Sequence, residues 1–562
     1  MLVERRSIQF FIILAAIMCV HQHSIAIERR VSVEDFGAKP NDHIDDSKAL
    51  SKAAAYCREN PNTVLVFSPG NYILKNELGI KTENAAMQGE FGRNPEPVIF
   101  KPNYPYGKGM DFSGSKGISI EGNGAILQCY GWFEPISITN SEYFSLKNIT
   151  IDYPNKPFSW GKVMEVTDSF FEVQFSDERI IDNKMVLGRM TFWNLQNDRL
   201  TKDVLYFPKR EILGNNRVRF HHKIGEDNLG QIATVLHCFH FRPAVLISGS
   251  TQTSIQDVTI HAQPGMGIVG FDSHNILVER LKVKPAPGYY HSTNTDATHF
   301  ACCSGLLRFD GCYFEAQGDD ATNVHGYYHT IMSTDDKTFV TKLEAPTFTH
   351  SQEIDLPRVG DKLELVNRET LQVVDTLIVE EAVTNQTTLQ NTIRVHKKVD
   401  IKPQNYYLMN VSKLPQLEFV NSTINSHLAR AILVKTRGVL IENNRINGSS
   451  NTAIHIGAEA WWSEGTHSQD VTVRNNLITN CGFQSTQGGA SGIAVIIDAK
   501  NTLNTYLHKN IKIENNTIVG SNNTCGIFIG NTSQVQLINN IITNCKQDIL
   551  IKSSSEVKIH SK

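Results

Sequence analysis

Short runs of alternating apolar and polar residues recur along most of the chain, and many of them end in Asn or Gly. Examples are 118–123 (ISIEGN), 254–260 (SIQDVTI), 439–444 (VLIENN) and 511–516 (IKIENN). Alternation with a period of two, bounded by turn residues, predicts short strands whose apolar side chains face a common interior. Because such units repeat, they predict a solenoid in which each coil covers the apolar face of the next.

Asn residues occupy equivalent positions in the later repeats. They are Asn444, Asn476, Asn516 and Asn540, at intervals of 32, 40 and 24 residues, which we interpret as one coil plus a variable loop. Asn tolerates the left-handed bend between strands, and aligned Asn side chains stack into a hydrogen-bonded ladder. The chain is therefore predicted to be all-β, with a right-handed parallel β-helix as its main body.

Two stretches interrupt the repeat, at 157–240 and 327–412. Both contain strands with charged connections and no Asn ladder, which indicates two inserted small β-barrel-like domains. A helix is predicted over 46–59, where the apolar residues form one stripe and Asp45 or Asp46 can cap the start. It would close one end of the solenoid. The predicted domains are a signal peptide (1–26), N-terminal coils with the capping helix (27–156), the first insert (157–240), catalytic coils (241–326), the second insert (327–412) and C-terminal coils (413–562).

The first residues have the pattern of an export signal. Two arginines precede the apolar run 8–20, and 24–26 (SIA) offers small residues for cleavage. The run is too short for a comfortable membrane span, and no later segment is long and apolar enough. We expect export, to the periplasm or the medium. A lipid anchor at Cys19 is not favoured, because the residues before it match a lipidation signal poorly.

Composition narrows the function classes. With 562 residues and a formal net charge of −3, the chain can bury a large core, and neither a nucleic acid nor a membrane surface is implied as a partner. The nine cysteines after Cys19 suggest no disulfide framework and no zinc site. Cys481 and Cys545 end near-identical phrases, NNLITNC and NNIITNC, and are expected to be buried, reduced thiols.

Three carboxylates form the strongest chemical signal. Asp296 precedes Asp319 by 23 residues and Asp320 by 24, close to the length of one coil. Neighbouring coils stack at roughly 4.7–4.9 Å, so this spacing predicts that the three acids meet on one face. Asp319 and Asp320 can share a site only at a bend, which Gly318 permits. Clustered carboxylates have pKa values that are pushed apart, as needed for the acid and the base that split a glycosidic bond.

The phrases around these acids resemble known β-helix hydrolases. The elements 35–38 (DFGA), 294–296 (NTD) and 318–320 (GDD) are similar to those of polygalacturonases in the pectin-degrading clan. The Gly-His-Gly of that family is absent, and its Arg-Ile-Lys element has no clean copy. By analogy with polygalacturonases, Asp319 is the acid and Asp296 with Asp320 activates the water; the reverse, with Asp296 as the acid, stays open.

Longer phrases resemble a second family more closely. The segments 294–299 (NTDATH), 318–326 (GDDATNVHG), 431–438 (AILVKTRG) and 460–465 (AWWSEG) are similar to the bacterial exo-acting α-1,3-galactosidases of glycoside hydrolase family 110. Those enzymes remove the terminal galactose of blood-group-B-type glycans. The resemblance implies an inverting glycoside hydrolase that needs no metal or other cofactor. An inverting glycosidase holds its acid and base roughly 6.5–9.5 Å apart.

Further polar and aromatic residues in these phrases are candidates for binding the substrate, an oligosaccharide or glycoconjugate with a terminal α-galactose. Amide and imidazole groups offer neutral hydrogen bonds, cations can stabilise carboxylates or bind hydroxyls, and an exposed indole suits the apolar face of galactose. The candidates are Asn323, His325, Arg430, Lys435, Arg437, Trp461, Trp462 and Glu464. Tyr289, Tyr290 and His291 are weaker candidates, because packing explains them equally well.

The sequence is also compatible with other functions. The chain is compatible with a polygalacturonase-like glycosidase on another glycan, or with a lyase in which the acids hold calcium. It is also compatible with a non-catalytic carbohydrate-binding or adhesive β-helix, since fold alone does not fix function. Exposed solenoid ends and two inserts favour a homodimer.

Overall fold

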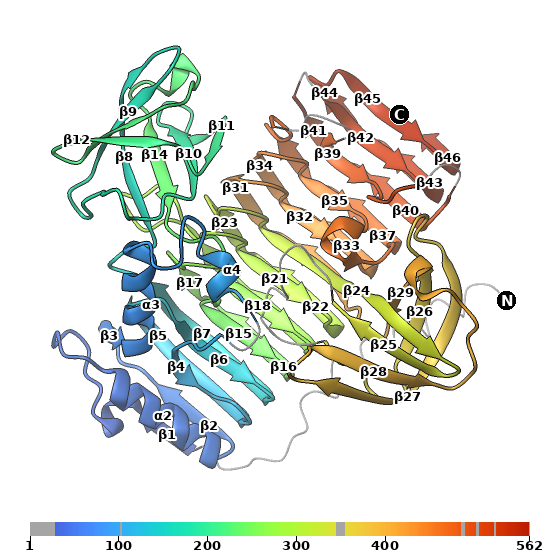
Figure 1. The fold of residues 1–562 in the computed structure, drawn as a ribbon, viewed down its shortest axis with the longest axis horizontal. Coiled ribbons are helices and arrows are strands. Elements are labelled where there is room, and N and C mark those ends of the chain that lie inside the picture. Colours follow the sequence, from blue (N-terminus) through green and yellow to red (C-terminus); the bar gives the residue numbers. More distant parts are fainter. Residues whose placement is uncertain are drawn as a thin grey trace.

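The protein is seen in a computed structural model that describes residues 29–101, 104–343, 355–484, 489–501, 505–521 and 524–560. The predicted signal peptide and Cys19 lie outside these residues. The described chain confirms the predicted parallel β-helix, whose coils run from the blue N-terminal end to the red C-terminal end in Figure 1. No helix in the described ranges combines the length and the apolar character needed to cross a bilayer.

Each coil contributes strands to three parallel ladders. The first ladder contains β1 (Arg29–Ser32), β2 (Thr63–Val66), the first parts of β5 (Lys116–Tyr130) and β7 (Glu142–Asp152), β16 (Thr251–Gln256), β19 (His274–Glu279), β22 (Ser304–Asp310), β30 (Gln416–Val420), β33 (Arg437–Glu442), β37 (Gln469–Arg474), β40 (His508–Glu514), β43 (Thr532–Ile538) and β46 (Ser555–His560). The second contains β3 (Asn71–Lys75), the later parts of β5 and β7, β17 (Thr259–Ile260), β20 (Lys282–Val283), β23 (Tyr313–Glu315), β31 (Thr423–His427), β34 (Arg445–Ser449), β38 (Leu477–Thr479), β41 (Thr517–Val519) and β44 (Ile541–Thr543). The third contains β4 (Lys108–Asp111), β6 (Glu134–Thr139), β15 (Val245–Ser248), β18 (Ile268–Phe271), β21 (Thr298–Ala301), the start of β24 (Thr322–Asp335), β32 (Ile432–Val434), β35 (Ile454–Ile456), β39 (Ala490–Val495), β42 (Cys525–Gly530) and β45 (Gln547–Lys552).

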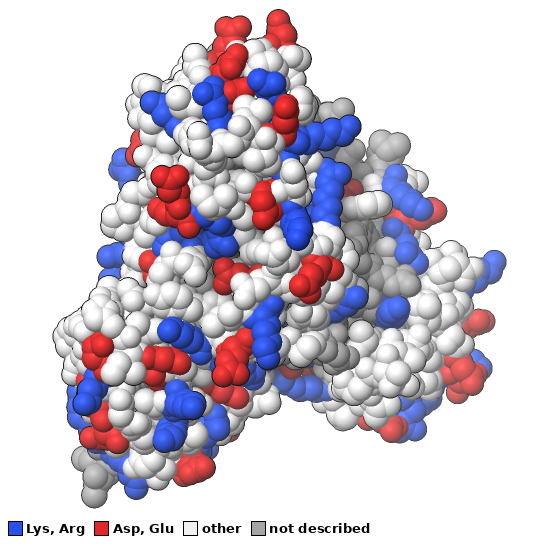
Figure 2. All heavy atoms as spheres, turned by 60° about the vertical axis from the view of Figure 1, so that its left-hand side comes forward, with Lys and Arg blue, Asp and Glu red and all other residues white. Residues whose placement is uncertain are grey.

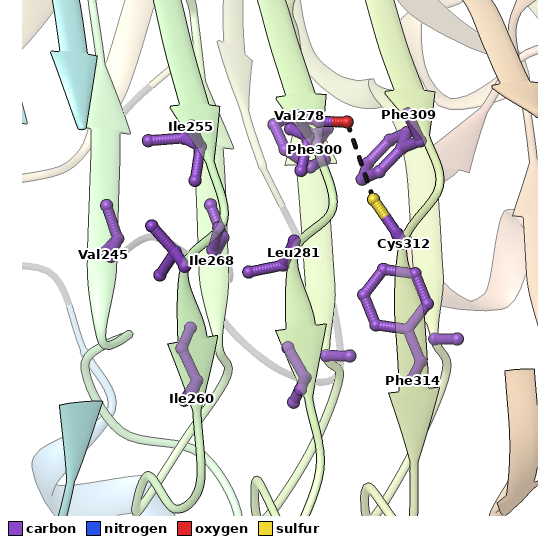
Figure 3. Packing of buried hydrophobic residues seen from close by; sticks show 14 of the residues in the cluster. Val245, Ile255, Ile260, Ile268, Val278, Leu281, Phe300, Phe309, Cys312 and Phe314 are labelled. Atoms are coloured by element: carbon purple, nitrogen blue, oxygen red, sulfur yellow. Dashed lines mark hydrogen bonds between the residues drawn. The ribbon is translucent and has the colours of Figure 1, made fainter. Parts of the chain in front are cut away.

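The inward-facing residues of these strands fill the interior of the coils. Ile255, Val278 and Phe309 occupy paired positions on β16, β19 and β22 and are fully buried, and Figure 3 shows such side chains stacked in line along the axis. Burial of each large aliphatic or aromatic side chain contributes roughly 1.5–3 kcal/mol. Of the nine described cysteines, all free, eight are buried as expected and Cys545 is partly buried.

The predicted Asn ladder is confirmed. Asn476 Oδ1 accepts hydrogen bonds from the backbone N and Nδ2 of Asn444, at 2.9 and 3.0 Å. Asn516 and Asn540 continue the chain in the same way. The left-handed bend falls on the preceding Asn of each pair, such as Asn475 with φ 58°. One Asn therefore turns the chain while the next binds the neighbouring coil.

Asn476→Ala is expected to lower the free energy of unfolding by about 2–4 kcal/mol, because buried backbone and amide groups of two coils lose their partners. Denaturant unfolding monitored by circular dichroism measures the change. Asn540→Ala is the control, since its side chain is only partly buried and water can replace it. Equal losses for both variants would contradict the role assigned to the ladder.

A helix covers the N-terminal end of the solenoid, as predicted. The helix α2 (Ser47–Glu59) buries Leu50, Ala53, Ala54 and Cys57 against the first coil. Asp45 binds the backbone N of Ser47, whereas the Asp46 carboxylate is turned away to the backbone N atoms of Lys39 and Ile73. The other helical elements of the described residues are η2 (Val33–Phe36), α3 (Glu77–Met87), α4 (Glu96–Ile99), η3 (Glu226–Asn228), η4 (Pro403–Asn405) and η5 (Ala460–Trp462).

The first insert is an antiparallel sheet that projects beside the coils (Figure 1). Its seven described strands pair in the order β11-β10-β14-β8-β9-β13-β12. They are β8 (Phe158–Val166), β9 (Phe171–Phe175), β10 (Arg189–Asn194), β11 (Arg199–Tyr206), β12 (Arg210–Gly214), β13 (Arg217–Phe220) and β14 (Ile232–Leu236). Trp193 and Leu200 pack against Ala316 and Leu428, and the backbone N of Leu200 donates to Ser426 Oγ at 2.7 Å. These contacts fix the insert next to the coils that carry the predicted acids.

The second insert is a small closed barrel. The strands pair in the ring β24-β25-β28-β27-β26-β29-β24 across the residues the structure describes. Besides the later part of β24 they are β25 (Thr338–Lys342), β26 (Lys362–Asn367), β27 (Val373–Asn385), β28 (Gln390–Val395) and β29 (Tyr406–Asn410). The chain leaves the solenoid along β24 and returns along β29, where Tyr328 pairs with Met409.

Candidate active site at the start of the third ladder

The three predicted acids come together where the chain enters the third ladder. Thr298 pairs with Thr322, which places Asp296 and Asp320 at equivalent positions two residues before β21 and β24. Carboxylate oxygens of Asp296, Asp319 and Asp320 lie within 4.8 Å of one another. The acids, which lie one coil length apart in the sequence, therefore form the predicted cluster in the structure.

The bend that lets Asp319 and Asp320 share this site depends on Gly318. Its backbone N donates to the carbonyl of Thr293 at 2.9 Å. A Cβ atom at this position would lie 2.1 Å from the carbonyl oxygen of Asn294, so a larger residue would push the two coils apart. The Asn294 amide itself is buried and donates to the carbonyls of Pro157 and Cys238, at the entry and exit of the first insert. Asn294 therefore attaches the insert beside the acids.

Asp320 is the most tightly held member of the trio. Its carboxylate accepts hydrogen bonds from the backbone N of Arg430 at 2.8 Å and from the guanidinium at 3.2 Å. Arg430 lies at the equivalent position of the next coil, because Thr322 pairs with Ile432. Burial, with the charges of Asp319 and Asp296, raises the pKa of Asp320, and Arg430 opposes this rise.

Asp319 is the most accessible acid, with 32% of its side chain exposed. Its carboxylate lies 3.6 Å from Arg189 on β10 of the first insert. Arg189 also donates to the carbonyl of Asn294 at 2.7 Å and packs over the ring of Phe239. The sequence analysis did not identify Arg189, because this residue lies in the first insert and outside the repeats.

Asp296 is held from the third ladder itself. His299, on β21, places its Nδ1 atom 2.6 Å from Asp296 Oδ2. The Nε2 atom of His299 lies 2.7 Å from Nε2 of His325, a predicted site residue on the next coil. Both imidazoles are buried. His299 belongs to the NTDATH phrase but was not singled out as a site residue.

A buried ion-pair group adjoins the histidines. Lys435, fully buried, places Nζ 2.6 Å from Glu464, 3.0 Å from Glu459 and 3.1 Å from the amide oxygen of Asn323. Glu464 reaches this position on β36 (Glu464–Gly465), which pairs antiparallel with β24. Burial raises the pKa of Glu459, but the opposing charges of Arg430 and Lys435 lower it to about 2. The predicted Asn323, Lys435 and Glu464 therefore form one network.

The remaining predicted binding residues differ in setting. Trp461 and Trp462 lie on η5 with 71% and 38% exposure, so both indoles are available for contact. Arg437 makes two hydrogen bonds, at 3.0 and 2.8 Å, to Glu364 on β26 and thereby attaches the second insert to the coils. The ring of Tyr289 packs edge-on against Phe158, as expected for a packing role.

Among the described residues, two groups of side chains come close enough to hold a cation: the acid trio, and His299 with His325 and Glu464. In the trio, Arg430 already binds Asp320 and His299 binds Asp296. In the second group the two Nε2 atoms lie 2.7 Å apart, in direct hydrogen-bond contact. The geometry therefore favours ion pairs and hydrogen bonds over a bound cation at both places.

Relatives match this chain over most of its length. The α-1,3-galactosidase A of Shewanella woodyi is 25% identical over 531 residues, which cover 89% of this chain and 83% of the relative. The α-1,3-galactosidase B of Bacteroides fragilis is 26% identical, covering 81% and 80%, and that of Bacteroides thetaiotaomicron 25%, covering 91% and 85%. The chain is a homologue of proteins named α-1,3-galactosidase. The resemblance seen in its motifs is confirmed, and these relatives support a glycoside hydrolase.

Two family models match parts of the chain. One, described as right handed beta helix region, matches residues 407–562, and the other, rhamnogalacturonase A/epimerase, pectate lyase-like, matches residues 30–168. Among solved structures, a mannuronan C-5 epimerase A-module of Azotobacter vinelandii has a TM-score of 0.43 at 10% identity, covering 94% of this chain and 98% of that one. A family 28 exopolygalacturonase of Yersinia enterocolitica has 0.39 at 12%, covering 95% and 78%.

Proposed function

We propose that the protein is an exo-acting α-1,3-galactosidase that releases terminal galactose from blood-group-B-type glycans. The observation that carries this proposal is the acid trio, assembled from two adjacent coils in a chain whose relatives bear that activity in their names. The exo mode and the glycan type come from the motif resemblance. Export through the N-terminal segment and homodimerisation stay predictions of the sequence.

In the proposed reaction Asp319 is the acid. It is the most exposed of the three, and its ion pair with Arg189, at 3.6 Å, leaves a carboxyl oxygen accessible to a sugar linkage. Its proton passes to the glycosidic oxygen as the bond to C1 breaks. Asp296 and Asp320, at equivalent positions of stacked coils, hold the water that attacks C1 and take its proton. Arg430, which donates to the Asp320 carboxylate at 2.8 and 3.2 Å, opposes the rise in its pKa that burial causes and so favours the ionised form that a base needs.

The exposed indoles of Trp461 and Trp462 offer an apolar surface on which the face of galactose can rest. The cations beside the acids are paired with carboxylates, Arg189 with Asp319 and Arg430 with Asp320, which argues against a polyuronate substrate. On the face shown in Figure 2, Lys and Arg are interspersed with Asp and Glu and do not gather into one cationic surface. A polyuronate would call for such a surface.

The first product of an α-1,3-galactoside is expected to be β-galactose, observed by proton NMR before mutarotation. The resemblance implies this inversion, whereas the acid oxygens approach within 4.8 Å. That is shorter than the roughly 6.5–9.5 Å usual for inverting enzymes and nearer the ~5–5.5 Å of retaining ones. Asp296 and Asp320, whose carboxylate oxygens lie within this distance of each other, are close enough to bind the attacking water together. Initial α-galactose would contradict inversion and would make one of the acids a nucleophile.

The deciding experiment is an assay of free galactose released from a linear α-1,3-galactosyl trisaccharide and from its fucosylated, branched counterpart. We expect the wild-type protein to release galactose from at least one of them, and equally in the presence of a chelator. Glycan binding without release would make the protein a non-catalytic binding module. Loss of activity in chelator, restored by calcium, would instead assign the trio to a cation.

A further inference from the structure

Four groups of the site form a series of hydrogen bonds. Asp296 Oδ2 lies 2.6 Å from His299 Nδ1, His299 Nε2 lies 2.7 Å from His325 Nε2, and His325 Nδ1 lies 2.9 Å from the carbonyl oxygen of Gly326. An ionised carboxylate and a backbone carbonyl can only accept hydrogen bonds. Both ends of the series are therefore acceptors, and the two imidazoles between them must supply every proton.

Counting protons gives the charge state of this series. Three hydrogen bonds need three protons, but two neutral imidazoles carry one N–H each. We propose that the series holds one additional proton, carried by His299 as an imidazolium that donates to both Asp296 and His325. A proton on the carboxyl group of Asp296 would also complete the count. Imidazole is the stronger base, by roughly 2–3 pKa units in reference compounds, so His299 is the preferred position.

The surroundings favour a positive charge here. Within the network of contacts described above, five carboxylates (Asp296, Asp319, Asp320, Glu459, Glu464) face three permanent cations (Arg189, Arg430, Lys435). Glu464 Oε1 lies 3.7 Å from His325 Nε2, and the ring of Tyr327 packs edge-on against His325. On the other side, His240 Nδ1 lies 3.0 Å from Glu96; burial lowers the pKa of His240, but Glu96, Asp296 and Asp319 together raise it. An imidazolium at His299 compensates part of the excess negative charge.

This assignment rests on the proposed function, and it makes His299 a positioning residue that acts through Asp296. A cation in direct contact with Asp296 keeps that carboxylate ionised beside Asp319 and Asp320, as a base requires. Removing the cation would raise the pKa of Asp296, since an opposite charge at such distance usually lowers a carboxyl pKa by ~1–3 units. His325 acts on Asp296 indirectly. Its Nε2 lone pair accepts a hydrogen bond from the second N–H of His299 and so stabilises the imidazolium.

Nitrogen-15 NMR of histidine-labelled full-length protein tests the proton directly. The resonances of His299 are assigned from the spectrum of His299→Gln, those of His325 from His325→Phe. We expect both nitrogens of His299 to carry protons at pH 7, and His325 to keep one bare nitrogen. A neutral His299 at pH 7 would overturn the proposal whether or not the protein hydrolyses a galactoside, so its failure is distinct from failure of the proposed function.

The pH profile of kcat/KM provides the second readout. His299→Gln and His325→Phe should each move the acid limb to higher pH by ~1–3 units, because Asp296 then needs a higher pH to ionise. His329→Gln is the matched control: it removes another buried His–Asp pair, with Asp355 at 2.8 Å in the second insert. A purely structural role would lower kcat at every pH and leave the limb in place, which would also overturn the proposal.

Discussion

Asp319→Asn is expected to lower the turnover of an α-1,3-galactoside by at least ~10²-fold, a typical cost of losing acid–base catalysis. Asn has the shape of Asp but no proton to give the leaving oxygen. The fold should tolerate the change, because a third of the side chain is exposed and its ion pair with Arg189 spans 3.6 Å. Asp296→Asn and Asp320→Asn are expected to cost at least as much, since both remove the base for water. Initial rates of galactose release measure all three.

The leaving group separates the roles within the trio. A galactoside with a nitrophenolate leaving group needs little protonation, so it should recover much of the rate of Asp319→Asn and little of that of Asp296→Asn. The control is Asp257→Asn, which alters a surface ion pair with Arg280 and should leave turnover unchanged. If Asp319→Asn keeps near-normal activity on the natural linkage, Asp319 is not the acid. If the nitrophenyl galactoside instead recovers only the rate of Asp296→Asn, Asp296 is the acid and Asp319 belongs to the base.

Lys435→Met should lower the free energy of unfolding by about 3–5 kcal/mol, the usual cost of removing one partner from a buried ion pair. Methionine fills much of the space of the lysine stem. It leaves Glu459 and Glu464 without their shared ammonium group, 3.0 and 2.6 Å away, in a fully buried position. Chemical denaturation measures the change.

Lys512→Met is the matched control. Its ammonium group binds Glu514 at 2.8 Å, but 40% of the lysine side chain is exposed. A surface pair of this kind contributes ~0–1 kcal/mol, so the control should lose at most that amount. A small effect for Lys435→Met would show that the two glutamates take up protons or rearrange at little cost, and the network would not hold Glu464 in place.

The coils could be predicted from the sequence because their determinants are local and repeated. In each Asn pair the first residue, such as Asn475, turns the chain and the second, such as Asn476, binds the next coil, so the repeated phrases that contain the pair identified both. The acid trio followed from the same logic, since one coil length separates Asp296 from Asp320. The identical 24-residue offset links His299 with Asn323, and that signal could have identified His299.

Arg189 could not be found this way. It reaches Asp319 only because the first insert packs on the coils through contacts such as Trp193 with Leu428. Such docking depends on surfaces distant in sequence, for which no periodicity exists. Glu459 was missed for a related reason: its position is set by a turn that pairs it with Glu464, and by Arg430 and Lys435 from the preceding coil.

The route by which the chain enters and leaves the small barrel has a consequence for how such proteins diversify. Outgoing and returning strands are hydrogen-bonded neighbours at Tyr328 and Met409, about 5 Å apart as in any antiparallel pair. A tight hairpin could join them at this point, and Arg430 would still stack beneath Asp320. The barrel is thus inserted between two hydrogen-bonded residues, so its size can change without altering the ladder positions that place Arg430 beside Asp320.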